Sequence, residues 1–125
     1  MDIKIFNLLF LPAIISFAIS LLVTYLVIRY AKKLGILDTP GKRGDPATLH
    51  TKPIPRGGGI PIFLSILITS IIFLPLDSRA IGIFFGAGIV AFIGFLDDRN
   101  NANPYLRLLG QFLAAGVVFL LPQTL

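Results

Sequence analysis

Charged residues are scarce in this sequence, and cysteine is missing from it. Only 14% of the 125 residues are charged, whereas a soluble domain of this length usually has about a quarter. The chain has too little polar surface to coat a water-soluble globule, so lipid must form part of its solvent. The lack of cysteine excludes disulfides and thiolate chemistry, although it does not identify a cellular compartment.

Long apolar runs take the place of the missing charge, since 55% of the residues are hydrophobic. Four of these runs are long enough for transmembrane helices, which need about 17–25 residues. They show no alternation of apolar and polar residues that would indicate a β-barrel. We therefore predict an all-α fold, a polytopic transmembrane helical bundle that forms a single membrane domain over residues 1–125. The four predicted spans cover about residues 5–28, 58–76, 80–96 and 107–123.

Positive charge is concentrated between the first two predicted spans. The net charge is +5, and seven of the eleven Lys and Arg residues lie in this loop. The positive-inside rule places the loop in the cytoplasm, so the N-terminus and the turn at 77–79 lie outside and segment 97–107 is cytoplasmic again. A basic loop between apolar runs favours anionic lipid or phosphate substrates over nucleic acid as partners. The seven residues are Arg29, Lys32, Lys33, Lys42, Arg43, Lys52 and Arg56.

An acidic pair, Asp97 and Asp98, follows the third predicted span. Paired carboxylates suit Mg²⁺, which binds one or two carboxylates and keeps waters and substrate phosphates as its other ligands. The pair is therefore a candidate catalytic and metal-binding group. The alternative is that the two acids end the helix and solvate the loop, with the neighbouring Arg99 offsetting their mutual repulsion.

A basic, glycine-rich run leads into the second predicted span. It has the sequence HTKPIPRGGG and contains His50, Lys52 and Arg56, whose side chains suit phosphate. The glycines could present backbone N–H groups to an anion at the start of a helix. The alternative is a basic loop that rests on anionic lipid, with glycines allowing a tight return into the membrane.

The acidic pair and the basic run are predicted to share one face of the membrane. Cationic groups for phosphate beside carboxylates for Mg²⁺ are what phosphoryl transfer requires. A transporter more often has ionisable residues within its spans, and the four apolar runs, the last of which begins after Arg107, lack them.

Several short motifs together resemble the polyprenyl-phosphate N-acetylhexosamine-1-phosphate transferases (glycosyltransferase family 4). The resemblance extends from about Gly35 to Gln111, and the form PRGGG with His50 upstream is more similar to the N-acetylglucosamine-1-phosphate transferases than to the phospho-N-acetylmuramoyl-pentapeptide transferases. The motifs are LDTP (Leu37 to Pro40), Arg43, HTKPIPRGGG (His50 to Gly59), GFLDD (Gly94 to Asp98) and LLGQ (Leu108 to Gln111).

The resemblance implies an activity and a set of site residues. Such an enzyme transfers a sugar-1-phosphate, here N-acetylglucosamine-1-phosphate, from a UDP-sugar to polyprenyl phosphate in the cell membrane, with Mg²⁺ as cofactor. The products are polyprenyl-diphosphate-sugar, used for cell-envelope polysaccharides, and UMP. Asp97 and Asp98 match the acidic pair near the metal and the lipid phosphate, and Lys52, His50 and Arg56 are the candidates for phosphate binding.

Further expectations concern the loop between the first two spans, the length of the chain and its assembly. Asp38 matches a family position, for which we expect a role in ordering the loop, and residues 30–59 should be mostly irregular or contain short surface helices. Family members are longer, so we expect this chain to be an N-terminal part that is inactive alone and could pair as a homodimer. The alternatives are a truncated, non-catalytic module that binds lipid phosphate or a partner bundle, and a small transporter.

Overall fold

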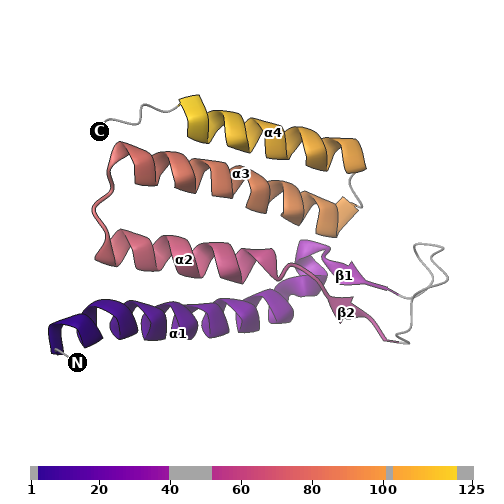
Figure 1. Cartoon of the computed structure of the whole chain (residues 1–125). Helices are drawn as coiled ribbons and strands as arrows, with labels where there is room; N and C mark the ends of the chain where they lie inside the picture. Colours follow the sequence, from indigo (N-terminus) through magenta and orange to yellow (C-terminus); the bar gives the residue numbers. More distant parts are fainter. Residues whose placement is uncertain (1–2, 40–51, 101–102, 121–125) are drawn as a thin grey trace.

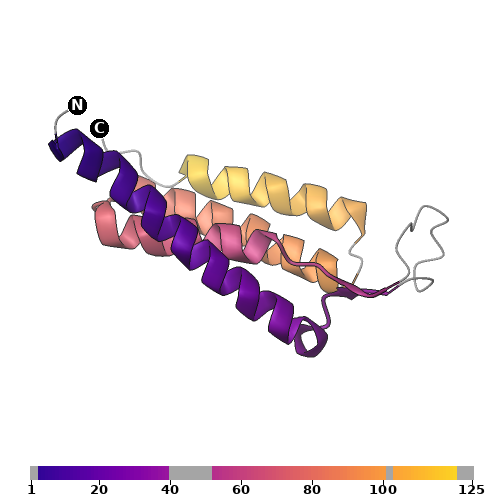
Figure 2. The same cartoon turned by 90° about the horizontal axis from the view of Figure 1, so that it is seen from below.

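The computed structural model describes residues 3–39, 52–100 and 103–120. The helices stand side by side in chain order (Figure 1), and α1 crosses α2 obliquely (Figure 2). The prediction of an all-α fold is confirmed, with one very short strand pair added to it. The elements are α1 (Ile3–Leu34), β1 (Leu37–Asp38), β2 (Ile54–Pro55), α2 (Gly59–Phe73), α3 (Ser78–Asn100) and α4 (Pro104–Leu120).

Two helices in the described part of the chain are long and apolar enough to cross a membrane. The first is Leu8–Leu34 of α1, and the second is α3, Ser78–Asn100. Only 6% of the most apolar stretch is buried in the first helix and 11% in the second. The core helix of a soluble protein would be mostly buried, so this exposed apolar surface indicates that the chain associates with a membrane. Helices α2 and α4 are also apolar but shorter, with 15 and 17 residues, and their crossing of the membrane remains a prediction.

Helix α1 continues beyond its predicted end at residue 28 because charged side chains do not stop a helix. It ends where Gly35 adopts a φ of 72°. The Ile36 N–H donates a hydrogen bond to the Ala31 carbonyl oxygen 3.1 Å away, which is the Schellman arrangement that commonly ends helices. Lys32 and Lys33 lie in the last turn, where positive charge interacts favourably with the helix dipole.

Side-chain caps set the starts of α3 and α4, which both begin before their predicted spans. The Asp77 Oδ1 atom accepts a hydrogen bond from the Ala80 N–H at 2.8 Å, and the Asn103 Oδ1 atom accepts one from the Tyr105 N–H at 3.0 Å. Such caps satisfy N–H groups that lack a partner within the helix. Pro104 is the first residue of α4, a position that proline favours.

Small residues allow α3 and α4 to pack closely. Gly82 and Gly86 of α3 are buried, as are Gly110 and Ala114 of α4. A methyl group added at Gly86 would lie 2.6 Å from the side chain of Val118 and 3.1 Å from the Ala114 carbonyl oxygen. Close approach of helix backbones through small residues is the usual basis of helix association in lipid.

A small hydrophobic cluster and the strand pair join the ends of three helices. Ile36 is fully buried between Val27 and Ala31 of α1, with Ile60 of α2 and Phe95 of α3 packed against them. The strands β1 and β2 pair antiparallel in the register Leu37↔Pro55 and Asp38↔Ile54. We expected residues 30–59 to be mostly irregular or to contain short surface helices. This expectation is wrong for residues 30–34, which continue α1, and for the two short strands. Residues 40–51 lie outside the described part.

Candidate functional site

The two polar segments of the sequence meet at one end of the helix layer. In Figure 1 this end holds the last turn of α1, both strands, the start of α2, the end of α3 and the start of α4. The turn between α2 and α3 lies at the opposite end. The sequence motifs before α2 and at the end of α3 thus lie at the same end of the helices. Our prediction that both share one face of the membrane requires this arrangement.

Arg56 and Asp38 form an ion pair at this end. The Arg56 Nη2 atom donates a hydrogen bond to the Asp38 Oδ2 atom at 2.5 Å, and the Asp38 side chain is only 9% exposed. The register pairs Asp38 with Ile54, two residues before Arg56, so both side chains lie on the same face of the strand pair as diagonal neighbours. A buried carboxylate is costly without a cationic partner, and Arg56 supplies that charge. The pairing supports the loop-ordering role expected of Asp38.

Asp98 lies near the same loop and lines one groove with Gly59 of the PRGGG motif. The Arg56 charge and the Gly57 backbone N–H favour the ionised form of its carboxyl. Partial burial raises the pKa of the Asp98 carboxyl above its ordinary value. The Arg56 charge lowers this pKa, the negative charge of Asp97 raises it, and the Gly57 backbone N–H lowers it.

The backbone at Gly57 requires glycine. Its φ is +96°, and a methyl group there would lie 2.9 Å from the Ile36 Cδ1 atom and 3.5 Å from Val27. Residues with a Cβ atom rarely adopt this conformation. Gly57 thus allows the chain to turn over the hydrophobic cluster, against which Phe95 of α3 also packs.

Asp97 has a different cationic partner from the one that the sequence suggested. Its Oδ1 atom lies 3.3 Å from the Arg107 Nη2 atom of α4, and both side chains are partly exposed. The neighbouring Arg99 instead lies along Gly35, at the end of α1. The sequence could not distinguish the two arginines, because adjacent residues on a helix point in different directions.

The remaining candidates are less constrained. Lys52 is exposed, in the segment that precedes β2, and His50 lies outside the described residues. No group of three or more His, Cys, Asp or Glu side chains placed to hold a metal occurs within the described ranges. Two adjacent carboxylates fit a Mg²⁺ ion that keeps waters and substrate oxygens as ligands, and do not fit a metal enclosed by protein.

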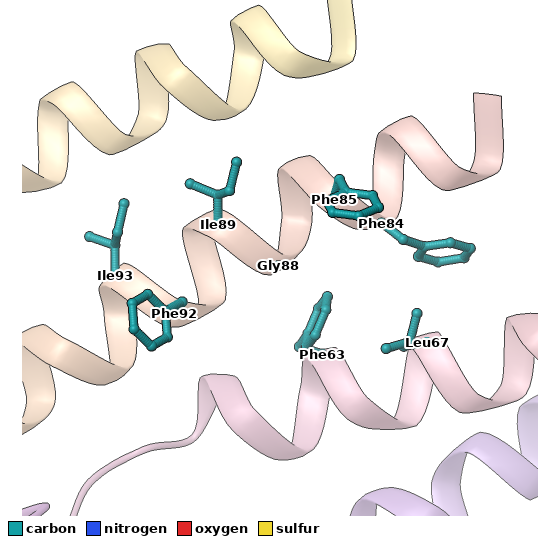
Figure 3. A pocket seen from close by; sticks show the side chains of 8 residues that line it. All are labelled: Phe63, Leu67, Phe84, Phe85, Gly88, Ile89, Phe92 and Ile93. Atoms are coloured by element: carbon teal, nitrogen blue, oxygen red, sulfur yellow. The ribbon is translucent and has the colours of Figure 1, made fainter. Parts of the chain in front are cut away.

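Apolar grooves separate α2 from α3. One has a volume of about 510 Å³ and only apolar lining residues, with Phe63 and Leu67 pointing from α2 toward α3 (Figure 3). A second groove of about 600 Å³ is lined by apolar side chains of both helices and reaches Asp97 and Asp98 at one end. This second groove therefore connects an apolar surface of the protein with the acidic pair.

A comparison with curated proteins found a relative of matching chemistry. Over 114 residues the chain is 32% identical to a Bacillus subtilis (strain 168) protein named "Probable undecaprenyl-phosphate N-acetylglucosaminyl 1-phosphate transferase". The family resemblance is thereby confirmed. The match covers 89% of this chain and 29% of the relative, so the chain spans less than a third of that protein's length. No family model matches the sequence, and no solved structure matches it.

Proposed function

We propose that the protein containing this chain transfers a sugar-1-phosphate from a UDP-sugar to polyprenyl phosphate and releases UMP. The observation that carries the proposal is that Gly59 of the PRGGG motif lines one groove with Asp97 and Asp98 at one end of the helices (Figure 1). The similarity to a transferase named for undecaprenyl phosphate supports it. The name of that relative makes N-acetylglucosamine-1-phosphate the first group to test.

The reaction forms one phosphorus–oxygen bond and breaks another. An oxygen of the lipid phosphate attacks the phosphorus attached to the sugar, and the bond from that phosphorus to the oxygen of the departing UMP breaks. One carboxylate of the pair, Asp97 or Asp98, orients or deprotonates the attacking phosphate. Lys52 and His50 are the proposed phosphate ligands, because cationic groups offset the charge that develops during transfer. Arg56 already has a carboxylate partner in Asp38.

Asp97 and Asp98 are the residues that would hold Mg²⁺. The Asp97 ion pair with Arg107 uses Oδ1, so the other oxygen of that carboxylate can serve as a ligand. A bound Mg²⁺ ion would neutralise phosphate charge in the substrates.

The proposed topology has four spans, with the acidic pair and the basic loop in the cytoplasm and the N-terminus outside. The groove between α2 and α3 supports this arrangement, because it offers an apolar surface that ends at the carboxylates. A lipid with a phosphate head has this combination of an apolar chain and a charged end.

The proposal is tested with the complete gene product in membranes, supplied with UDP-N-acetylglucosamine, undecaprenyl phosphate and Mg²⁺. We expect release of UMP together with a lipid-linked sugar, and loss of both when the metal is chelated. Binding of undecaprenyl phosphate without UMP release would instead indicate a non-catalytic module. Parallel reactions with other UDP-sugars identify the sugar that is transferred.

Replacement of the acidic pair should abolish most of the turnover. Asp97→Asn and Asp98→Asn keep the shape of each side chain but remove its charge, so we expect kcat to fall by roughly 10²–10³-fold in each variant. UMP release measures the effect, and Asp77→Asn, in the turn at the other end of the helices, is the control. Nearly normal rates in both site variants would contradict the assignment of the pair.

A further inference from the structure

Three cations lie on the outer side of α1, near its C-terminal end. Val27 and Ala31 are buried in the hydrophobic cluster and mark the side of α1 that faces the protein. Arg29 and Lys33 each follow one of them by two positions, which is about 200° around the helix axis. Both are exposed, as is Lys32 beside them. Because α1 is the outermost helix of the layer (Figure 1), these side chains face away from the other helices.

Tyrosines orient two of these cations. The Arg29 Nη1 atom donates a hydrogen bond to the Tyr25 hydroxyl oxygen at 3.3 Å. The Lys33 Nζ atom lies 5.6 Å from the centroid of the Tyr30 ring, which is a cation–π distance. Among the described residues, no carboxylate forms an ion pair with Arg29, Lys32 or Lys33. Since tyrosine is neutral, the two contacts hold the cations without cancelling their charge.

The cations lie at the depth of lipid head groups. From Leu8 to Ile28 the helix carries no charged residue, and this stretch rises about 30 Å. The hydrocarbon core of a bilayer is also about 30 Å thick, and the head-group layer on each side adds about 5–7 Å. Arg29 follows Ile28 directly, and Lys33 lies about 6 Å further along the axis. The three cations therefore occupy the layer in which lipid phosphates lie.

We propose that this basic face of α1, formed by Arg29, Lys32 and Lys33, binds the head group of an anionic phospholipid of the bilayer. Leu22 and Tyr25 lie on the same side of the helix, seven and four positions before Arg29, and are 60% and 57% exposed. The lipid phosphate complements the cations, and the acyl chains complement these side chains. The inference requires that α1 lies in a membrane and does not depend on the proposed function.

The polyprenyl phosphate carrier and a second copy of the chain fit this face less well. The acidic pair at which the carrier would react lines the groove between α2 and α3, and α2 stands between that groove and α1 (Figure 1). Two copies inserted in the same direction would bring the same ends of α1 together around a two-fold axis. Their cations would then repel each other, whereas an anionic phospholipid supplies the opposite charge.

The lipid selectivity of the complete gene product tests this inference. The protein is placed in phosphatidylcholine vesicles that contain a trace of spin-labelled phosphatidylglycerol or of spin-labelled phosphatidylcholine, and the fraction of label immobilised by the protein is measured. We expect the wild-type protein to prefer phosphatidylglycerol by roughly three-fold or more. The triple variant Arg29→Gln, Lys32→Gln, Lys33→Gln should show no preference. Arg29→Lys keeps the charge, and Arg79→Gln removes an exposed charge at the other end of the layer. Both controls should retain the preference.

Two results would overturn the inference directly, namely equal immobilisation of both lipids by the wild-type protein and an unchanged preference in the triple variant. The first would follow if a later segment of the gene product or a second copy covered this face of α1. Undecaprenyl phosphate added in an amount far below that of the phospholipid should not release the labelled phosphatidylglycerol. Its release from the wild-type protein would show that the carrier is the occupant, which would also contradict the proposal.

Thermal unfolding in detergent separates loss of the lipid site from loss of the fold. A ligand that binds only the folded protein stabilises it, so phosphatidylglycerol should raise the midpoint of the wild-type protein and phosphatidylcholine should not. Without added lipid the triple variant should unfold at the wild-type midpoint, and phosphatidylglycerol should leave that midpoint unchanged. If the triple variant does not fold, Arg29→Gln and Lys33→Gln each remove one charge and should each reduce the response. A full response in both single variants would count against the site.

Discussion

At the scale of single residues, the site depends on Gly57 more than on any other glycine of the PRGGG motif. A side chain at this position would require an unfavourable backbone conformation and would come within 2.9 Å of the Cδ1 atom of the fully buried Ile36. Gly58 has an ordinary helical φ of −59°, and an added methyl group there would meet no atom within 4 Å. Gly57 therefore does not tolerate a side chain, whereas the adjacent Gly58 does.

Gly57→Ala should therefore destabilise the protein and reduce its activity, whereas Gly58→Ala should do neither. The strain of a non-glycine residue at positive φ is about 1–2 kcal/mol, and a shift of this backbone would displace the motif that adjoins the acidic pair. Thermal unfolding and UMP release measure the two effects. Equal behaviour of the two variants would show that the turn tolerates a side chain.

Only part of the site could be predicted at this scale. The motif residues Asp97, Asp98 and Arg56 could be selected from sequence because their chemistry and order are distinctive. Their partners could not, because Asp38 and Arg56 are separated by 18 positions and Arg107 belongs to another helix. Contacts of this kind depend on how the chain folds back, which local patterns do not contain.

At the scale of the elements, apolar runs predicted the existence of all four helices but not their ends. The termini are set by Gly35 after α1, by the caps Asp77 and Asn103, and by Pro75 after α2. Leu74 is extended, as the residue before a proline prefers, so α2 ends at Phe73. The short strand pair gave no signal in the sequence, because two residues are too few for an alternating pattern.

The contact between α3 and α4 gives a prediction for helix packing. Gly86→Ala should lower the free energy of unfolding by roughly 1–3 kcal/mol, because the new methyl group meets a backbone carbonyl oxygen that cannot rotate away. Gly116→Ala on α4 is the matched control, since a methyl group there has nothing within 4 Å. Thermal unfolding in detergent compares them, and an unchanged midpoint for Gly86→Ala would indicate a looser packing of the two helices.

At the scale of the whole molecule, the proposed topology places the two ends of α2 on opposite sides of the membrane. The sequence contains no cysteine, so a single introduced thiol is a specific label site. Lys33 and Ser78 are both exposed, at opposite ends of the helix layer.

Labelling with a membrane-impermeant maleimide should therefore modify Ser78→Cys in intact cells, and Lys33→Cys only after the cells are permeabilised. The expectation follows from the cytoplasmic placement of the basic loop. The opposite pattern would reverse the orientation, and labelling of both positions from the same side would show that α2 does not cross the bilayer. Labelling of each variant in detergent is the control for reactivity of the thiol.

The short length of α2 has a consequence for the depth of the reaction. Its 15 residues rise about 22 Å, whereas the hydrocarbon core of a bilayer is about 30 Å thick. If α2 crosses, either the bilayer thins beside it or the first turn of the helix begins below the head-group level. In both cases the start of α2, and with it the adjoining acidic pair, lies no higher than the head groups of the surrounding lipid. The carrier can then present its phosphate while its hydrocarbon chain stays within the membrane.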